Sequence, residues 1–302
     1  MYGGMDDEVM DMQQGNVKSL ALQGEVAFAQ AFPDGTLGCE LCPRFCRMQN
    51  GDRGWCGSRF RKRDRMWAGN HNWLSVLKLA RIEAVPLAEY AGGAAVLKVG
   101  SFGSNFVPPR DGRSDQGLEA GMGRVLVPGD LAGICRMMVK QGCIGAAFVY
   151  GEPLMWYEFV MESAMLLKQC DMQNILATAG FVNKRPLQEL VPYLDAVRFD
   201  LYSFDPAYYR DVLRMDMSVV LRSLWVLAGS GVHLEVATPY LAGVNDSPEQ
   251  IESIARFLGS SFGRGLPYHV IVPDGDRETV DREKLLECLK AANQHLDSIY
   301  LS

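Results

Sequence analysis

From about residue 94 onward, short apolar runs alternate with longer segments in which apolar residues recur every three or four positions. The apolar runs are rich in β-branched and small residues and carry few interior charges. Strands of this kind, each followed by a helix, are typical of a parallel sheet covered by helices. The predicted strands are AAVLKVG (94–100), IGAAFVYG (144–151), NILATAGF (174–181), AVRFDLYS (196–203), HLEVATPY (233–240) and YHVIVPD (268–274), with SIYLS (298–302) as a candidate seventh.

The segments between these runs have helical spacing, and local signals mark some of their ends. SPEQ at 247–250 offers a serine N-cap and a proline at the first helical position, and AGSGV at 228–232 ends a helix in glycines. Six strand–helix units could form an incomplete barrel or an open doubly wound sheet. The pattern alone favours neither.

Length and charge exclude several classes of protein. The chain has 302 residues, of which 48% are hydrophobic, so it can bury a full-sized core as one large domain or a domain with an appendage. A net charge of −6 argues against a nucleic-acid-binding surface. The single basic run, at 58–65, is interrupted by Asp64 and is expected to be solvated.

No apolar segment approaches the roughly 20 residues that span a bilayer. The first residues, MYGGMDDEVMDMQQ, are acidic where a secretory signal is basic and then apolar. We therefore expect a cytoplasmic protein with no membrane partner.

Four of the eight cysteines fall within a short stretch, in the pattern Cys39-x2-Cys42-x3-Cys46-x9-Cys56. Four thiolates suit a closed tetrahedral zinc site or, equally, a [4Fe–4S] cluster, and the spacing does not separate the two. The sequence thus predicts one metal centre here. The other four, scattered through apolar-periodic segments, are expected to pack in the core (Cys135, Cys143, Cys170 and Cys288).

Several short blocks carry a resemblance to a known family. In order, they are CELCPRFCRMQNGDRGWCGSR, LSVLKLARIEAVPL, GSFGSNF, YGEP, ATAGF, DLYSFD, GVNDS and LPYH. In this order and at these spacings the chain resembles the radical SAM enzymes similar to pyruvate formate-lyase activating enzyme. The nearest likeness is to the branch called the AmmeMemoRadiSam system radical SAM enzyme, and it spans roughly residues 36–280.

The resemblance implies an α/β fold, a (β/α)6 partial TIM barrel with an N-terminal metal-binding appendage that carries the four clustered cysteines. The expected divisions are an N-terminal arm (1–38), a four-cysteine segment with a connector (39–93) and the partial barrel (94–302). In such barrels the chemistry lies in the loops at the carboxyl ends of the strands.

The chain departs from the family at the loop after the first strand. There the family reads approximately GTxGCNFxCxxC, and its three thiolates bind three irons of a [4Fe–4S] cluster whose fourth iron holds SAM. The matching positions in this chain are Ser104, Pro108 and Asp111. Iron–sulfur clusters need thiolate ligands, and proline has no donor at all. We therefore expect no core cluster and no reductive cleavage of SAM.

Other parts of a SAM site are retained in part. The family's DLK element becomes Asp200-Leu201-Tyr202, so an aspartate is kept and a lysine is replaced by an aromatic ring. Without the fourth iron, SAM binding is expected to be weak or absent. The residues expected to line the remaining ligand site are Tyr150, Gly151, Glu152, Thr178, Asp200, Tyr202 and His269.

Two classes of function follow from these features. The favoured one is a non-catalytic or regulatory paralogue, which keeps the barrel as a scaffold for a small ligand or a protein partner. The alternative is an enzyme with non-radical chemistry at the remodelled barrel mouth. The four-cysteine motif is intact although the core motif is lost, which suggests a role independent of radical chemistry and favours zinc as a structural metal.

Overall fold

The computed structural model describes residues 26–107 and 123–302. Its centre is an eight-stranded sheet in the order β15-β14-β13-β12-β11-β10-β8-β7. All neighbours pair in parallel except β7 and β8, which are antiparallel. The strands are β7 (Val76–Arg81), β8 (Ala95–Gly100), β10 (Cys143–Tyr150), β11 (Gln173–Thr178), β12 (Ala196–Asp200), β13 (His233–Pro239), β14 (Tyr268–Ile271) and β15 (Ile299–Leu301).

The strand order decides between the two topologies that the sequence allowed. From β8 to β15 the parallel strands lie side by side in chain order, without the reversal that defines a doubly wound sheet. Right-handed crossovers between such strands put every helix on the same face. The fold is therefore the expected α/β partial barrel, and the seventh strand at 298–302 is confirmed as β15.

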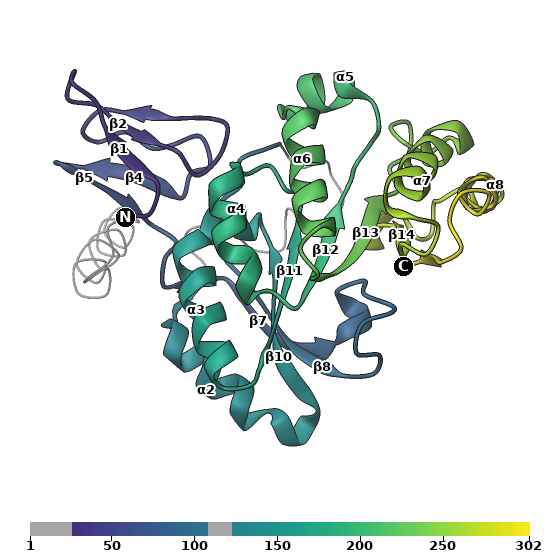
Figure 1. The fold of residues 1–302 in the computed structure, drawn as a ribbon, viewed down its shortest axis with the longest axis horizontal. Helices are drawn as coiled ribbons and strands as arrows, with labels where there is room; N and C mark the ends of the chain where they lie inside the picture. The colour runs from purple at the N-terminus through teal and green to yellow at the C-terminus, as the bar shows by residue number, and fades with distance from the viewer. Residues whose placement is uncertain (1–25, 108–122) are drawn as a thin grey trace, which may run out of the picture.

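The main helices cover the outer face of the sheet (Figure 1). Ser247 caps α7 as its sequence indicated, because its side chain accepts a hydrogen bond from the backbone N–H of Gln250. The helices are α2 (Pro128–Met137), α3 (Tyr157–Gln169), α4 (Lys184–Leu190), α6 (Met217–Ala228), α7 (Pro248–Phe262) and α8 (Arg282–Ala292), with a short α5 (Pro206–Tyr208) before a π-helical turn (Tyr209–Leu213).

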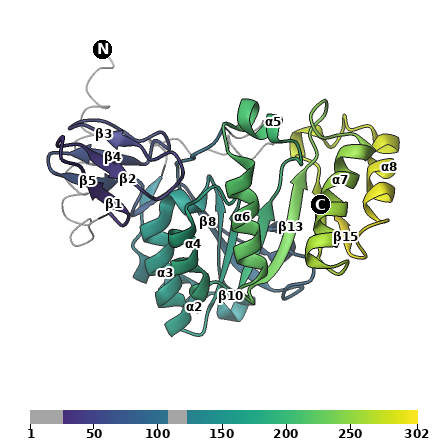
Figure 2. The same cartoon turned by 45° about the horizontal axis from the view of Figure 1, so that its top comes forward.

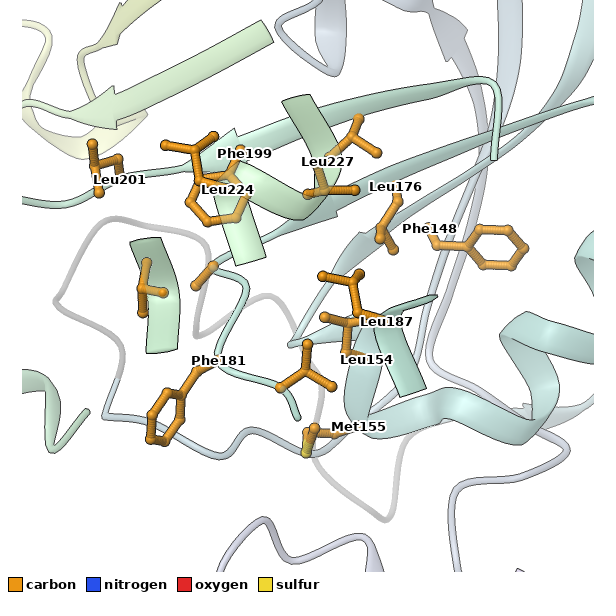
Figure 3. Packing of buried hydrophobic residues seen from close by; sticks show 14 of the residues in the cluster. Phe148, Leu154, Met155, Leu176, Phe181, Leu187, Phe199, Leu201, Leu224 and Leu227 are labelled. Carbon is orange, nitrogen blue, oxygen red and sulfur yellow. The ribbon is translucent and has the colours of Figure 1, made fainter. Parts of the chain in front are cut away.

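The large core lies between the helices and the outer face of the sheet. Figure 3 shows Phe148, Leu176 and Phe199, from three neighbouring strands, packed with Leu187 of α4 and Leu224 of α6. All five are at most 1% exposed. Because side chains alternate along a strand, the intervening residues face the inside of the barrel.

The inside of the barrel is crossed by the segment from Ile82 to Ala94. It begins with a 3-10 turn (Ile82–Ala84) and returns to β8, and its apolar side chains pack on small inner-face residues such as Ala147 and Ala177. The sheet therefore begins before the expected barrel boundary at residue 94, since β7 joins its edge and the connector fills part of its interior.

The N-terminal unit is a set of short strands at the opposite end of the molecule from α8 (Figure 2). It contains a three-stranded antiparallel sheet and a separate hairpin. Its strands are β1 (Ala29–Ala31), β2 (Leu37–Cys39), β3 (Arg47–Met48), β4 (Arg59–Lys62) and β5 (Arg65–Ala68), and a further small pair, β6 (Trp73–Leu74) with β9 (Arg124–Val125), follows.

Candidate functional site

Glu152 lies at the barrel mouth, in the turn that follows β10. Gly151 reaches the left-handed conformation of this turn, at φ 67°. The Glu152 carboxylate accepts hydrogen bonds from the Thr178 hydroxyl (2.7 Å), the Ala179 N–H (3.0 Å) and the Leu154 N–H (3.1 Å). Its own N–H donates to Gly103. Glu152 thus ties together three loops at the carboxyl ends of β8, β10 and β11.

Burial raises the pKa of Glu152 to about 7. Hydrogen bonds from Thr178 and from two backbone amides lower this pKa, but burial is the larger effect. The nearby Asp200 raises it further. A carboxyl with a pKa near neutrality can exchange a proton at physiological pH.

Asp200 ends β12 and is held by Arg198, two residues earlier on the same inner face. Both Asp200 oxygens accept hydrogen bonds from the Arg198 guanidinium, at 3.0 Å each. The third guanidinium nitrogen donates to the carbonyl of Val85 in the connector at 3.1 Å. Both side chains are buried, so this pair is part of the barrel interior.

His269 lies on the inner face of β14, level with Asp200 across the sheet. It is 1% exposed, and its Nε2 lies 2.6 Å from the carboxylate of Glu235. Its Nδ1 lies 3.1 Å from the hydroxyl of Ser302, and its ring stacks on Tyr300. Both nitrogens of His269 therefore have protein partners.

Glu235 collects four hydrogen bonds. Besides His269, it bonds to His233 (2.8 Å) and to the backbone N–H groups of Ala88 and Glu89 (2.9 Å each). Burial opposes its ionisation, but these hydrogen bonds outweigh burial and lower the pKa of Glu235 to about 2. The ionised carboxylate fixes the connector to β13 and β14.

Tyr202 is buried and fills space at the mouth. Its ring centroid lies 5.9 Å from that of Phe106. The backbone of Tyr202 is held by Tyr209 and Asn245.

The loop after β8 is described as far as Val107. Ser104 matches the first of the three cysteines that bind the cluster in the family that the sequence resembles. Its hydroxyl donates to the carbonyl of Phe106 at 3.0 Å. Pro108 and Asp111 lie outside the described residues. Within the loop, Asn105 donates its side-chain amide to the carbonyl of Phe181.

The four clustered cysteines all lie in the N-terminal unit. Cys39 and Cys42 are buried, and Cys46 and Cys56 are partly exposed. The sulfur of Cys46 accepts a hydrogen bond from the Trp55 N–H, and that of Cys56 lies 3.2 Å from the Ser58 hydroxyl. Within residues 26–107 and 123–302, no three Cys, His, Asp or Glu side chains are grouped closely enough to hold a metal ion as they stand.

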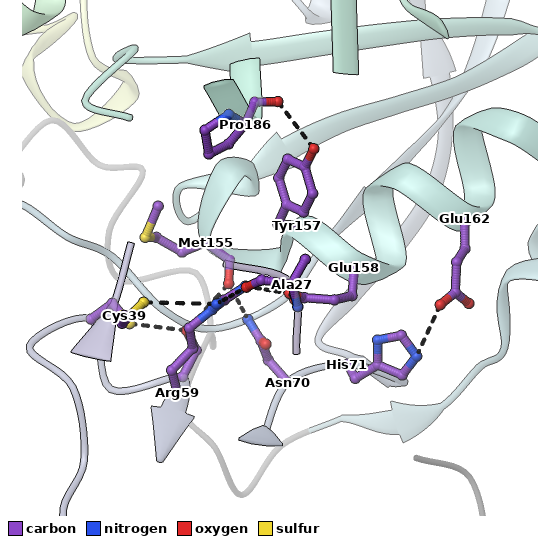
Figure 4. A network of polar contacts seen from close by, with 12 residues as sticks. Ala27, Cys39, Arg59, Asn70, His71, Met155, Tyr157, Glu158, Glu162 and Pro186 are labelled. Carbon is purple, nitrogen blue, oxygen red and sulfur yellow. Dashed lines mark hydrogen bonds and ion pairs between the residues drawn. The ribbon is translucent and has the colours of Figure 1, made fainter. Parts of the chain in front are cut away.

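The surroundings of these cysteines combine burial with one buried cation, Arg59. Arg59 is 1% exposed, and its guanidinium donates to the sulfur of Cys39 (3.7 Å) and to the carbonyl of Ala27 (2.7 Å) while pairing with Glu158 (Figure 4). Burial raises the pKa of the Cys39 thiol, and the positive charge of Arg59 opposes this. Burial raises the pKa of Cys42 to about 11. A buried cation offsets the negative charge that four thiolates place around a divalent ion.

The cysteine unit contacts the barrel mouth directly. The Ser104 N–H donates to the carbonyl of Cys56 at 3.2 Å, and the Arg44 guanidinium donates to the carbonyl of Asn105. On the other side, Asn183 donates its side-chain amide to the carbonyl of Glu40. The unit is thus fastened to the loops that follow β8 and β11.

Sequence reasoning missed the charged residues inside the barrel. Arg198, Glu235 and Lys98 each stand between apolar neighbours in a strand, at a position whose side chain faces inward. A charged residue between apolar neighbours was the available signal, because a buried charge requires a partner. The strands AVRFD and HLEVA both show it.

Comparison with known proteins gives distant relatives. No family model matches the chain. An uncharacterized protein of Methanocaldococcus jannaschii is 24% identical over 257 residues, which cover 81% of this chain and 73% of that protein. Pyruvate formate-lyase 2-activating enzyme of Escherichia coli is 31% identical over 114 residues, and (2S)-3-sulfopropanediol dehydratase activating enzyme of Klebsiella oxytoca is 26% identical over 113. These two matches cover 38% and 37% of this chain, but only 39% and 36% of the activating enzymes.

Solved structures give a likeness of the same kind. A domain of pyruvate-formate lyase-activating enzyme from Bacteroides vulgatus superposes with a TM-score of 0.47 at 19% identity, covering 52% of this chain and 98% of that one. The fold assignment above therefore rests on strand order and pairing. None of the helices among the described residues is long and apolar enough to cross a membrane.

Proposed function

We propose that this chain, which is similar in sequence to activating enzymes such as pyruvate formate-lyase 2-activating enzyme, is a degenerate radical SAM enzyme without the core [4Fe–4S] cluster. Its barrel serves as a scaffold that binds a small ligand or a protein partner at the mouth. The N-terminal cysteines hold one structural metal centre, for which we favour zinc over a [4Fe–4S] cluster.

The observation that carries the proposal is the lack of thiols in the loop after β8. No residue from 57 to 134 is a cysteine, so this loop offers no thiolate at any position. Ser104, at the first expected ligand position, already bonds to Phe106 within the loop. Soft iron–sulfur clusters are held by cysteine thiolates, and a loop without them has no means to keep one.

The carboxylates that remain at the mouth also support a role other than radical chemistry. Glu152 accepts hydrogen bonds from three protein donors, and both oxygens of Asp200 are bound by Arg198. These contacts tie the loops of the mouth to one another and to the connector. An amino group of SAM would have to compete with them for the same oxygens.

The proposed metal centre would be held by Cys39, Cys42, Cys46 and Cys56. A closed tetrathiolate site contributes folding free energy and no open coordination position. Its four thiols would have to turn toward a common point. Arg59, beside Cys39, is placed to offset the charge.

Metal analysis with visible absorbance on anaerobically purified protein tests both parts of the proposal. We expect one zinc, or one four-iron cluster, per chain. The Cys39→Ala/Cys42→Ala variant should lose it, whereas Cys170→Ala, at a cysteine outside the cluster, should keep it. Incubation with SAM and dithionite should yield no 5′-deoxyadenosine above a protein-free control. Two four-iron clusters per chain, or cleavage of SAM, would refute the proposal.

One observation favours the alternative, an enzyme with non-radical chemistry. His269 lies between the carboxylate of Glu235 and the hydroxyl of Ser302, at 2.6 and 3.1 Å. A histidine oriented by a carboxylate and bonded to a hydroxyl is an arrangement that can move a proton. A hydrolytic activity that His269→Gln abolishes without unfolding the protein would establish this alternative.

A further inference from the structure

Two large aromatic side chains are exposed on the turns that carry the clustered cysteines. Phe45 precedes Cys46 and is 55% exposed, and Trp55 precedes Cys56 and is 46% exposed. The backbone N–H of Trp55 donates to the sulfur of Cys46 at 3.3 Å, so the two turns are in contact. Phe45 also has a φ of 45°, an unfavourable conformation for a bulky residue. The protein therefore keeps an exposed aromatic ring at a position that is costly for its backbone.

Two arginines accompany these rings. The Arg44 guanidinium lies 4.0 Å from the ring centroid of Trp55, and it donates hydrogen bonds to backbone carbonyls. Arg53 donates to the carbonyl of Gly57 at 3.3 Å, across the turn that contains Trp55. These acceptors are neutral, so the hydrogen bonds leave both guanidinium charges in place. We name the following four residues the aromatic–arginine patch: Arg44, Phe45, Arg53 and Trp55.

The acidic stretch near the N-terminus suits this patch in its chemistry. Residues 5–12, which lie outside the described part of the chain, read MDDEVMDM, with four acidic and four apolar side chains and no basic one. Carboxylates form charge-assisted hydrogen bonds with guanidinium groups, and methionine sulfur makes favourable contacts with aromatic rings. The stretch thus offers a partner to each kind of side chain in the patch.

The described chain also starts close to the patch. The carbonyl of Ala27 accepts a hydrogen bond from the Arg59 side chain at 2.7 Å. The Arg59 carbonyl in turn accepts one at 2.8 Å from Gly54, the residue before Trp55. Thirteen residues join the acidic stretch to the first described residue, and a chain of this length spans about 45 Å at most. The patch is therefore within reach, and a tethered stretch meets it at a high effective concentration, so that a weak interaction suffices.

We propose that residues 5–12 dock on the aromatic–arginine patch of their own chain. The carboxylates pair with Arg44 and Arg53. The methionine side chains cover Phe45 and Trp55. The docked stretch lies beside the barrel mouth, because Arg44 is also bonded to the loop after β8. An acidic protein partner would have to displace it to reach this surface. The inference goes beyond the proposed function and depends neither on the metal nor on SAM.

Site-specific photocross-linking in the full chain tests the docking. Phe45 is replaced by p-benzoylphenylalanine, whose exposed ring captures the segment that lies against it. We expect a cross-link to residues 5–12 within a monomer, identified by mass spectrometry. Its yield should fall about fivefold or more in roughly 0.5 M sodium chloride, which screens exposed charges. Neutralising the acidic side chains, in Asp6→Asn/Asp7→Asn/Glu8→Gln/Asp11→Asn, should lower the yield by a similar factor.

A matched control separates docking from simple tethering. The same replacement at Leu286 of α8, which is also 55% exposed, should give no cross-link to residues 5–12. Arg53→Gln, added to the chain that carries the photoreactive group at position 45, should lower the yield because one guanidinium is removed. These substitutions fall on exposed positions or within residues 5–12, so none of them removes a buried side chain.

Four outcomes would overturn the proposal. A cross-link to a second copy would assign the patch to self-association, and a cross-link elsewhere in the monomer, or none, would leave residues 5–12 away from the patch. Equal capture from position 286, or a yield that is unchanged when the acidic side chains are neutralised, would reduce the contact to tethering. The cross-linking uses neither SAM nor reductant, so its failure is distinct from failure of the metal and SAM assays that test the proposed function.

Discussion

The backbone N–H of Ser104 donates a hydrogen bond to the carbonyl of Cys56 at 3.2 Å, so the cysteine unit and the loop after β8 share a contact. Gly103 fits closely in the same place, because a Cβ there would lie 2.9 Å from the Cβ of Ser58. The N-terminal unit is therefore more than an appendage. It forms one side of the barrel mouth through these contacts.

If the cysteines hold the proposed metal, we expect that its removal loosens the mouth as well as the unit. Chelation, or the Cys39→Ala/Cys42→Ala variant, should speed amide hydrogen exchange at Ser104 and at Asn183, whose N–H donates to the carbonyl of Leu41. Exchange at Val236 in the central sheet serves as the internal control and should not change. If amide exchange becomes faster only within residues 39–60, the unit and the mouth are independent.

Glu152 should make the protein less stable as the pH rises. Its pKa is raised from 4.5 to about 7 in the folded chain, so the folded state binds the proton more tightly than the unfolded state does. Stability is then lost between about pH 4.5 and pH 7, by about 3 kcal/mol in all. Urea denaturation at pH 5 and pH 8 measures it, and Glu152→Gln should remove this difference. If the free energy of unfolding falls by the same amount between pH 5 and pH 8 in Glu152→Gln, the effect belongs to another group.

Glu235 should act in the opposite sense. Its pKa is lowered from 4.5 to about 2, so its contribution is fully present above about pH 4.5 and is lost as the pH falls through 2. About 3 kcal/mol of stability depends on this carboxylate. Acid denaturation followed by circular dichroism should therefore begin at higher pH in Glu235→Gln than in the exposed control Glu287→Gln. Identical acid midpoints would contradict the prediction.

The strands and their order of appearance could be predicted, because each buried parallel strand is a short apolar run. The partners across the interior could not. Arg198 pairs with Asp200 on its own strand, but Glu235 bonds to His269 from the next strand and to Ala88 from a connector about 150 residues earlier. These contacts depend on register and on the path of the connector, which short apolar runs do not specify. For the same reason β7 was expected to be part of a connector, although it belongs to the sheet.

Arg198 and Asp200 should be more costly to separate than to replace together. Both are buried, at 5% and 6% exposure, and they share two hydrogen bonds. Arg198→Met leaves a buried carboxylate without this partner and should cost about 3–5 kcal/mol of unfolding free energy. The double variant Arg198→Met/Asp200→Leu should recover most of the loss, because no unpaired charge remains. Additive losses in urea denaturation would show that the two side chains act separately.

SAM should bind weakly to this chain. Under the proposal that no iron chelates its amino and carboxylate groups, binding would depend on Glu152 and Asp200, which already accept hydrogen bonds from Thr178 and Arg198. Tyr202 and Phe106 also occupy space at the mouth. We expect a Kd weaker than about 100 μM, equivalent to a binding free energy of about 5 kcal/mol or less. Calorimetric titration with SAM measures it, with S-adenosylhomocysteine as a comparison. A micromolar Kd that Glu152→Gln weakens would mean that the mouth has been rebuilt around SAM, and would favour the enzyme over the scaffold.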